Sequence, residues 1–106
     1  MGNFVLAYTG GSMPESPEEG EKVMAAWMGW FGALGAAVVD RGNPFGPSMS
    51  ISPDGKATDG NAAGLTGYSI ISADTLAEAT EMAKRCPQLA SGGSVEVYET
   101  IVIGEP

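Results

Sequence analysis

The stretch TGYSIISADTLAEATEMAKRCP, residues 66–87, joins an apolar run to an amphipathic segment and ends in a proline. Residues 65–72 are rich in Ile and Tyr, which favours a β-strand. Thr75 can cap a following helix, because Glu78 stands at the third helical position. The apolar stripe of that helix comprises Leu76, Ala79, Ala83 and Cys86. We expect Pro87 to end the helix, so this stretch predicts a strand and a helix of the scaffold.

The first part of the chain predicts the same succession of strand and helix. Residues 3–9 (NFVLAYT) are rich in strand formers on both faces. Ser16, followed by a proline and by Glu19, has the pattern of a helix start. The helix runs to about Leu34, with Gly35 as its C-cap. Its apolar face comprises Val23, Met24, Trp27, Met28, Trp30, Phe31 and Leu34.

The middle of the chain predicts short extended segments separated by turns. Residues 37–40 (AVVD) begin a second strand, and the turn-rich RGNPFGP follows it. Residues 48–52 (SMSIS) then resume extended structure, and residues 59–64 (DGNAAG) form a further loop. In the first helix, Gly29 and Gly32 disfavour a helix interior, so we expect them to let the helix closely approach another backbone or a ligand.

A last strand at residues 94–103 (SVEVYETIVI) completes the order strand, helix, strand, strand, helix, strand. With right-handed crossovers this order predicts one α+β domain over residues 1–106, a ferredoxin-like βαββαβ sandwich. Its four-stranded antiparallel sheet has both helices on one face. Because the strands carry bulky apolar residues on both faces, the uncovered face needs a partner. We expect a second copy packed sheet to sheet, that is, a homodimer.

Composition excludes several classes of function. The net charge of -8 would repel a phosphate backbone, so we expect no nucleic-acid partner. No segment approaches the ~20 apolar residues that span a bilayer, and the N-terminus lacks a secretory pattern, which predicts a cytoplasmic protein without a membrane partner. With one cysteine and no histidine, the chain lacks the usual general base and the commonest metal ligands. We expect neither a metal nor a cofactor.

Aromatic and polar side chains offer candidates for a ligand site. Trp27, Trp30 and Phe31 can line an aromatic pocket, with core packing as the alternative. Asp40 and Arg41 end the second strand, where they can orient a polar substrate and handle a proton. A solvated pair in a turn is the alternative. Asn43, in the same turn, is a further candidate for ligand binding.

Four other residues carry weaker signals. Tyr8 and Tyr68 lie on predicted strands and can present phenols inside a barrel, although packing at a dimer interface explains them as well. Asp59 can act as an acid or base at a cleft, and turn chemistry is its alternative. Cys86 has no histidine to activate it and lies on an apolar stripe, so we interpret it as a buried, inert thiol.

The segment GYSIISADTLAEATEMAKRCPQLASGGSVEVYE resembles the YCII-related family, which includes the DGPF-domain proteins. The motifs FVLAY, SPEE, MAAW and GNPFG of the N-terminal half are similar too. The resemblance implies a dimeric α/β barrel, in which two ferredoxin-like units pack through their sheets. Some relatives have a His and Asp pair, at the positions of Met24 and Cys86 here. The DGPF motif falls at residues 59–62 and keeps its first two residues, Asp59 and Gly60.

Two functions remain open. The first is a small homodimeric protein that binds a small organic ligand, or acts in regulation, through a partly apolar cleft between the sheet and the first helix. The second is a cofactor-independent enzyme of isomerase, lyase or hydrolase type, acting on a small organic acid or lactone, with Asp40, Asp59 or a tyrosine as acid or base. The absence of histidine and of the family pair favours the first.

Overall fold

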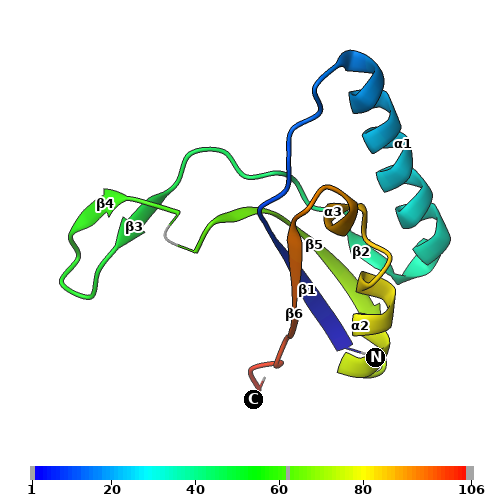
Figure 1. The fold of residues 1–106 in the computed structure, drawn as a ribbon. Helices are drawn as coiled ribbons and strands as arrows, with labels where there is room; N and C mark the ends of the chain where they lie inside the picture. The colour runs from blue at the N-terminus through cyan, green and yellow to red at the C-terminus, as the bar shows by residue number, and fades with distance from the viewer. Residues whose placement is uncertain (1, 62, 105–106) are drawn as a thin grey trace.

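The computed structural model describes residues 2–61 and 63–104. Figure 1 shows the elements in chain order: β1 (Gly2–Thr9), α1 (Pro17–Leu34), the 3₁₀ turn η1 (Gly35–Ala37), β2 (Val38–Asp40), β3 (Met49–Ile51), β4 (Ala57–Asp59), β5 (Leu65–Ala73), α2 (Leu76–Ala83), α3 (Pro87–Ala90) and β6 (Ser94–Glu99). No helix in these residues has the length and apolar character needed to span a membrane.

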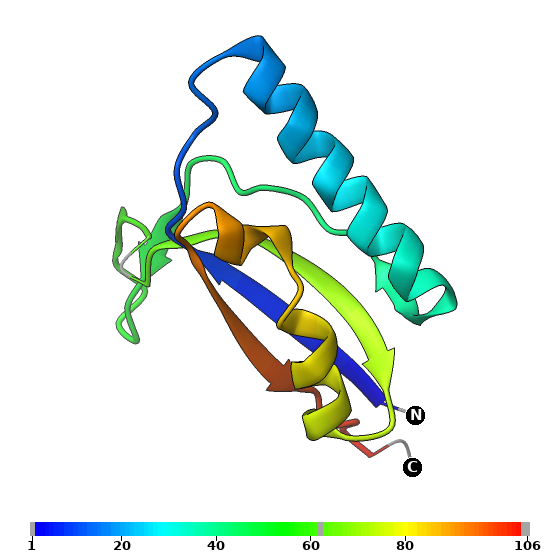
Figure 2. The ribbon, with the colours of Figure 1, turned by 45° about the vertical axis from the view of Figure 1, so that its right-hand side comes forward.

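Four of the strands form an antiparallel sheet in the order β2-β5-β1-β6. This order is that of a ferredoxin-like sandwich, so the predicted α+β fold is confirmed. The helices lie on one side of the sheet (Figure 2). Because side chains alternate along a strand, Phe4, Leu6 and Tyr8 of β1 all face these helices. There they join the buried core with Ile71 of β5 and Ala79 of α2.

The opposite face of the sheet is also largely apolar. Val5 and Ala7 of β1 point to this side, as do Tyr68 and Ile70 of β5, which stand opposite them in register. Tyr98 of β6 pairs with Val5 and is 55% exposed. Helices α1 and α2 cover the other side, as the sequence predicted, together with the short α3, and leave this face open (Figure 2). We call it the open sheet face.

Both long helices begin where their capping residues predict. The Ser16 Oγ accepts a hydrogen bond from the Glu19 backbone N–H at 3.2 Å, and the Glu19 carboxylate accepts one from the Glu15 N–H. At the start of α2, the Thr75 Oγ1 accepts a hydrogen bond from the Glu78 backbone N–H at 3.1 Å. Side-chain caps of this kind satisfy backbone donors that have no partner inside the helix. Gly35 caps the end of α1 with a positive φ of 56°, and its N–H bonds to the Phe31 carbonyl.

The expected end of the second helix is wrong. Helix α2 ends at Ala83, and Pro87 begins α3 instead of ending α2. Proline suits the first position of a helix and disfavours helical backbone in the residue before it, and Cys86 is accordingly extended. Leu76 of the expected apolar stripe is largely exposed, whereas Cys86 is buried just beyond the helix.

The last strand is shorter than expected, because β6 ends at Glu99 and not at residue 103. Glu99 stands opposite Phe4, near the start of β1, so the partner strand runs out at this point. Thr100 makes the last bonds, through its N–H and its hydroxyl, both to the Asn3 carbonyl at 3.0 and 2.7 Å. Residues 101–104 leave the sheet, and we call residues 101–103 the C-terminal tail.

Residues 49–51 are extended, as expected, but they do not belong to the four-stranded sheet. Strand β3 pairs with β4 in a separate two-stranded hairpin, which extends away from the body of the protein (Figure 1). The turn that closes it is stabilised locally, because the Ser52 N–H bonds to the Lys56 carbonyl at 2.9 Å and Asp54 accepts from the Lys56 N–H. Asp59 therefore ends a strand instead of opening a loop, and Ala62 lies outside the described residues.

Helix α1 packs on the sheet through its second half. Trp30 and Phe31 are buried, whereas Val23, Met24 and Met28 of the expected apolar face are 40%, 63% and 48% exposed. The expected close approach at Gly29 and Gly32 is wrong within the chain, because a Cβ added at either would meet no atom within 4 Å.

Candidate functional site

The predicted aromatic residues of α1 do come together, and Tyr8 joins them. Trp27 lies at the centre of the group, with ring centroids 5.3 Å from Tyr8 and 5.8 Å from both Trp30 and Phe31. Trp30 is buried, and its indole N–H donates to the Met82 carbonyl of α2 at 3.1 Å. Trp27 is partly exposed. Trp30 and Phe31 are thus core residues, and Trp27 is the ring that solvent or a ligand can reach.

Asp40 and Arg41 point in different directions. The Asp40 carboxylate accepts from the Gly42 N–H at 2.8 Å and from the Tyr68 hydroxyl at 3.3 Å, on the side of the open sheet face. The Arg41 guanidinium lies over the Phe31 ring, 5.8 Å from its centroid, on the side of α1. The two side chains therefore do not act as one pair.

Tyr8 and Cys86 are buried together. The Tyr8 hydroxyl donates to the Ser69 Oγ at 2.7 Å, and Ser69 donates to the Arg41 carbonyl at 2.6 Å. Burial raises the pKa of the Tyr8 phenol and that of the Cys86 thiol. Both groups therefore stay protonated at neutral pH, which suits neither a base nor a nucleophile.

Asn43 belongs to a turn that lies tightly against β5. Its carbonyl accepts from the Tyr68 N–H at 3.3 Å, and the next residues continue along the strand through a bridge between Pro44 and Gly67. Gly42 has a φ of +76°, and a Cβ there would lie 1.6 Å from the Tyr68 carbonyl oxygen. Only glycine fits this close approach of the turn to β5. The hydrogen bond that holds the turn to β5 joins two backbone groups.

A cavity of about 370 Å³ lies beside the aromatic group, between α1, the loop that precedes it and α3. We call it the helical cleft. It is lined by Ser12, Met13, Pro14, Glu19, Lys22, Val23, Ala26, Trp27, Pro87, Gln88, Ala90 and Ser91. Of the predicted site residues, Trp27 is the member that lines it. Its volume lies within the range of small-molecule sites.

Hydrogen bonds hold the walls of the helical cleft together. The Gln88 side-chain amide donates to the carbonyls of Thr9 and Gly10, both at 3.0 Å, and the Ser12 N–H donates to the Ser91 carbonyl at 3.0 Å. These bonds join the loop after β1 to α3. Sequence reasoning missed Gln88 and Ser91, because nothing in the QLASGG segment shows that it packs against the loop 79 residues earlier.

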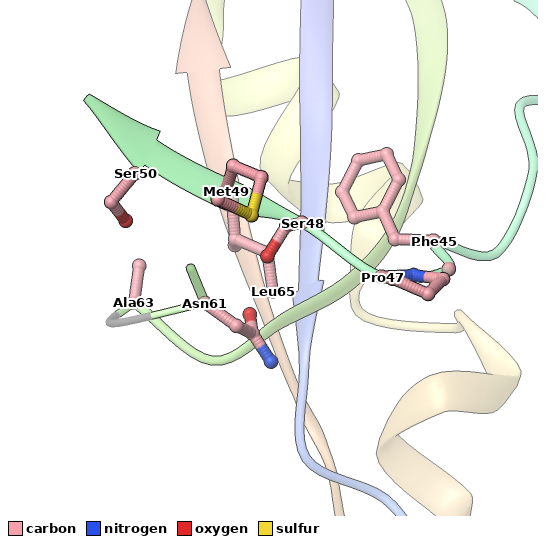
Figure 3. A pocket seen from close by; sticks show the side chains of 9 residues that line it. Phe45, Pro47, Ser48, Met49, Ser50, Asn61, Ala63 and Leu65 are labelled. Atoms are coloured by element: carbon pink, nitrogen blue, oxygen red, sulfur yellow. The ribbon is translucent and has the colours of Figure 1, made fainter. Parts of the chain in front are cut away.

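A second cavity, of about 520 Å³, opens where the β3–β4 hairpin leaves the sheet (Figure 3). We call it the hairpin pocket. Its lining comprises Phe45, Gly46, Pro47, Ser48, Met49, Ser50, Asn61, Ala63 and Leu65, none of them charged. Phe45 also stacks on Tyr68, with centroids 5.7 Å apart and an interplanar angle of 19°. Asp59 is exposed on β4 and lines neither described cavity.

Metal-ligating side chains do not gather in the parts of the chain that the structure describes. Residues 2–61 and 63–104 contain no group of three or more Asp, Glu, Cys or His placed to hold an ion.

The fold and the helical cleft define a ferredoxin-like α+β protein with a cavity of small-molecule size beside its first helix. The chain belongs to the YCII-related family, because the family model of the YCII-related domain matches residues 5–103. None of the curated proteins shows significant sequence similarity to it.

Among solved structures, the chain is similar to 5-chloro-2-hydroxyhydroquinone dehydrochlorinase (TftG) from Burkholderia phenoliruptrix AC1100, in complex with 2,5-dihydroxybenzoquinone. The identity is 19%, the match covers 93% of each chain, and the TM-score is 0.53. TftG belongs to the dimeric α/β barrel superfamily. The likeness confirms the fold that the sequence predicted.

Proposed function

We propose that this chain is a homodimeric binding protein, and that the helical cleft receives a small, flat organic molecule without catalysing its conversion. The observation that carries this proposal is the position of Trp27, whose partly exposed ring forms one wall of a cavity of about 370 Å³. An indole face is a good contact surface for a planar ring. Val23 and Ala26 extend this apolar wall along α1.

The polar groups of the cleft suit an anionic or strongly polar oxygen on the ligand. Lys22 offers an ammonium group to such an oxygen, whereas the Ser12 and Ser91 hydroxyls donate to backbone carbonyls and can only accept from a ligand. TftG holds 2,5-dihydroxybenzoquinone, a flat ring with several oxygens, on the same fold. The family resemblance places a histidine at Met24 and an aspartate at Cys86. In the sequence these positions adjoin Val23 and Pro87, which both line the cleft.

The titratable groups support binding over catalysis. The Tyr8 phenol and the Cys86 thiol are kept protonated by burial, and the Tyr8 hydroxyl already donates to Ser69. Glu19, which lines the cleft, accepts a hydrogen bond from the Glu15 N–H as part of the helix cap. A base poised near neutral pH is what proton transfer requires, and neither the Tyr8 phenol nor the Cys86 thiol supplies one.

The open sheet face supports the homodimer. Val5, Tyr68, Ile70 and Tyr98 leave apolar surface on this uncovered face, and such a patch is typical of an interaction surface. A two-fold axis would place the same face of a second copy on it. The buried free thiol of Cys86 suits a reducing compartment, so we place the protein in the cytoplasm.

Native mass spectrometry followed by calorimetric titration tests this proposal. We expect a dimer that binds 2,5-dihydroxybenzoquinone or 2,5-dihydroxybenzoate saturably. Trp27→Leu should weaken the binding of both ligands at least tenfold, because it removes the ring wall, and Lys22→Gln should also weaken both, because the dihydroxyquinone is anionic at neutral pH as the carboxylate is. Lys84→Gln, on α2, removes the same charge away from the cleft and is the matched control. Equal binding by wild type and Trp27→Leu would refute the role of the cleft.

A second candidate function is a cofactor-independent enzyme for a small organic acid or lactone. The hydrogen bond between the Tyr68 hydroxyl and the Asp40 carboxylate, at 3.3 Å, favours it, because both groups are accessible and could share a proton with a substrate. Incubation of wild type with lactones and hydroxy acids, followed by mass spectrometry, tests for turnover. Turnover that survives Asp40→Asn unchanged would exclude this pair as the catalytic group.

A further inference from the structure

The C-terminal tail carries three consecutive aliphatic residues that their own subunit leaves in solvent. Ile101, Val102 and Ile103 are 85%, 86% and 88% exposed, directly after the end of β6. Removing such side chains from water is favourable in proportion to the apolar area that is buried. A run of this kind is therefore expected to find a partner surface.

The hairpin pocket offers an apolar surface of matching character. Phe45, Met49 and Leu65 line it and are 48%, 63% and 37% exposed. Neither the lining of the pocket nor the tail contains a charged side chain. The hairpin pocket and the three aliphatic tail residues can therefore meet through apolar contact, with Glu99 and Glu105 in the sequence on either side of the tail.

A tail cannot reach the pocket of its own subunit. Thr100 is fixed to the Asn3 carbonyl at one end of β1, whereas Leu65 of the pocket pairs with Thr9 at the other end. Thr9 lies six residues after Asn3 along β1, which is a distance of about 20 Å. The three residues of the tail, fully extended, reach about 10 Å. Figure 1 shows the C-terminal segment and the base of the hairpin at opposite ends of the sheet.

We propose that in the homodimer the C-terminal tail of each subunit fills the hairpin pocket of the other. This inference rests on the proposed function, because it requires the open sheet faces to meet. A two-fold axis that lies between the sheets and runs across the strands reverses the strand direction of the second copy. It thereby brings each tail end opposite the other subunit's hairpin end, and the two contacts form together.

Cross-linking tests the position of the tail. Met49→Cys and Val102→Cys proteins are prepared separately, mixed, allowed to exchange subunits and treated with a short bismaleimide. Cys86 is buried, so the new thiols are the accessible ones. We expect a Met49→Cys/Val102→Cys heterodimer as the main product, identified by tryptic mass spectrometry. Linkage of two Val102→Cys chains to each other would instead indicate an axis parallel to the strands and overturn the proposal.

A double-mutant cycle on the dimer dissociation constant provides the second test. We expect Ile101→Ser/Ile103→Ser and Met49→Ser each to raise this constant at least tenfold, and their combination to raise it little further, because both remove one contact. Leu89→Ser, an exposed leucine on the helix side, is the control and should leave it unchanged. A stable dimer in which the tail variants have no effect refutes this inference and leaves the dimer itself intact. A monomeric wild type refutes the dimer.

Discussion

The Tyr8 hydroxyl and the Ser69 Oγ lie 2.7 Å apart inside the core, and Ser69 passes a second hydrogen bond to the Arg41 carbonyl at 2.6 Å. Ser69 is fully buried. This short chain of bonds therefore fastens the turn after β2 to the centre of the sheet. Ser69 therefore has a structural role in the core, and no binding site is needed to explain this buried polar residue.

Ser69→Ala should destabilise the protein more than Tyr8→Phe. Removing the serine leaves the buried Tyr8 hydroxyl and the Arg41 carbonyl without this partner, which costs about 1–3 kcal/mol for each group that finds no replacement. Tyr8→Phe removes one bond and leaves the Ser69 donor satisfied, for about 1 kcal/mol. Urea unfolding measures both. Ser72→Ala, whose hydroxyl makes a long 3.5 Å bond, is the control, and an equal loss in Ser69→Ala and Ser72→Ala would contradict the argument.

Stability should fall at alkaline pH, and Tyr8 should cause much of the loss. Burial raises the pKa of Tyr8 in the folded protein above its value of about 10 in the unfolded chain. A raised pKa contributes stability that is fully present below pH ~10 and is lost as the pH rises through the folded pKa, at no more than about 1.4 kcal/mol per pH unit. Cys86 acts in the same direction, beginning near pH 8.5.

Unfolding in urea between pH 8 and 11 tests this dependence. Tyr8→Phe should flatten the decline above pH 10, and Cys86→Ala should flatten it below that value. A Tyr8→Phe protein with the wild-type slope would show that this phenol does not titrate on unfolding.

The fold could be predicted from the sequence because it rests on local signals. Ser16 with Glu19 and Thr75 with Glu78 are capping pairs whose hydrogen bonds form within one turn of the chain. The strand formers in residues 3–9 and 65–72 correctly predicted β1 and β5. The extent of β6 was overestimated, because the alternation of Ile101 and Ile103 continues past the point where the partner strand β1 ends.

The candidate site was harder to predict because it depends on contacts between distant segments. The aromatic residues Trp27, Trp30 and Phe31 could be grouped from their spacing on one helix. The other wall of the cleft consists of Gln88 and its neighbours, whose position follows from bonds to the carbonyls of Thr9 and Gly10. An ordinary polar residue in a short loop gives no sign of such a contact.

Two glycines should respond in opposite ways to alanine. Gly42→Ala should be strongly destabilising, because its φ is positive and the new Cβ would overlap the Tyr68 carbonyl. Gly32→Ala should stabilise the protein by about 0.5–1 kcal/mol, since it lies inside α1 and its Cβ meets nothing within 4 Å. Thermal unfolding of both variants measures the contrast. A Gly32→Ala protein that is less stable, or no longer dimeric, would show that a second copy covers this part of α1.

The proposed homodimer should become tighter as salt is added. Each subunit carries a net charge of -8, and Glu96 of β6 lies on the open sheet face, because it stands opposite Ala7. Raising the ionic strength from about 0.01 to about 0.1 M shortens the Debye length from about 30 to about 10 Å and so screens the repulsion between subunits. We expect the dissociation constant, measured by analytical ultracentrifugation, to fall several-fold over this range.

Removing one charge at the interface should reduce this dependence on salt. Glu96→Gln is expected to tighten the dimer at low salt and to flatten its response. Glu21→Gln, which removes the same charge from the exposed side of α1, should do so much less, because the distance between the two charges sets the repulsion. A dimer that weakens with added salt would mean that ion pairs hold the subunits together. It would therefore locate the interface away from the apolar sheet face.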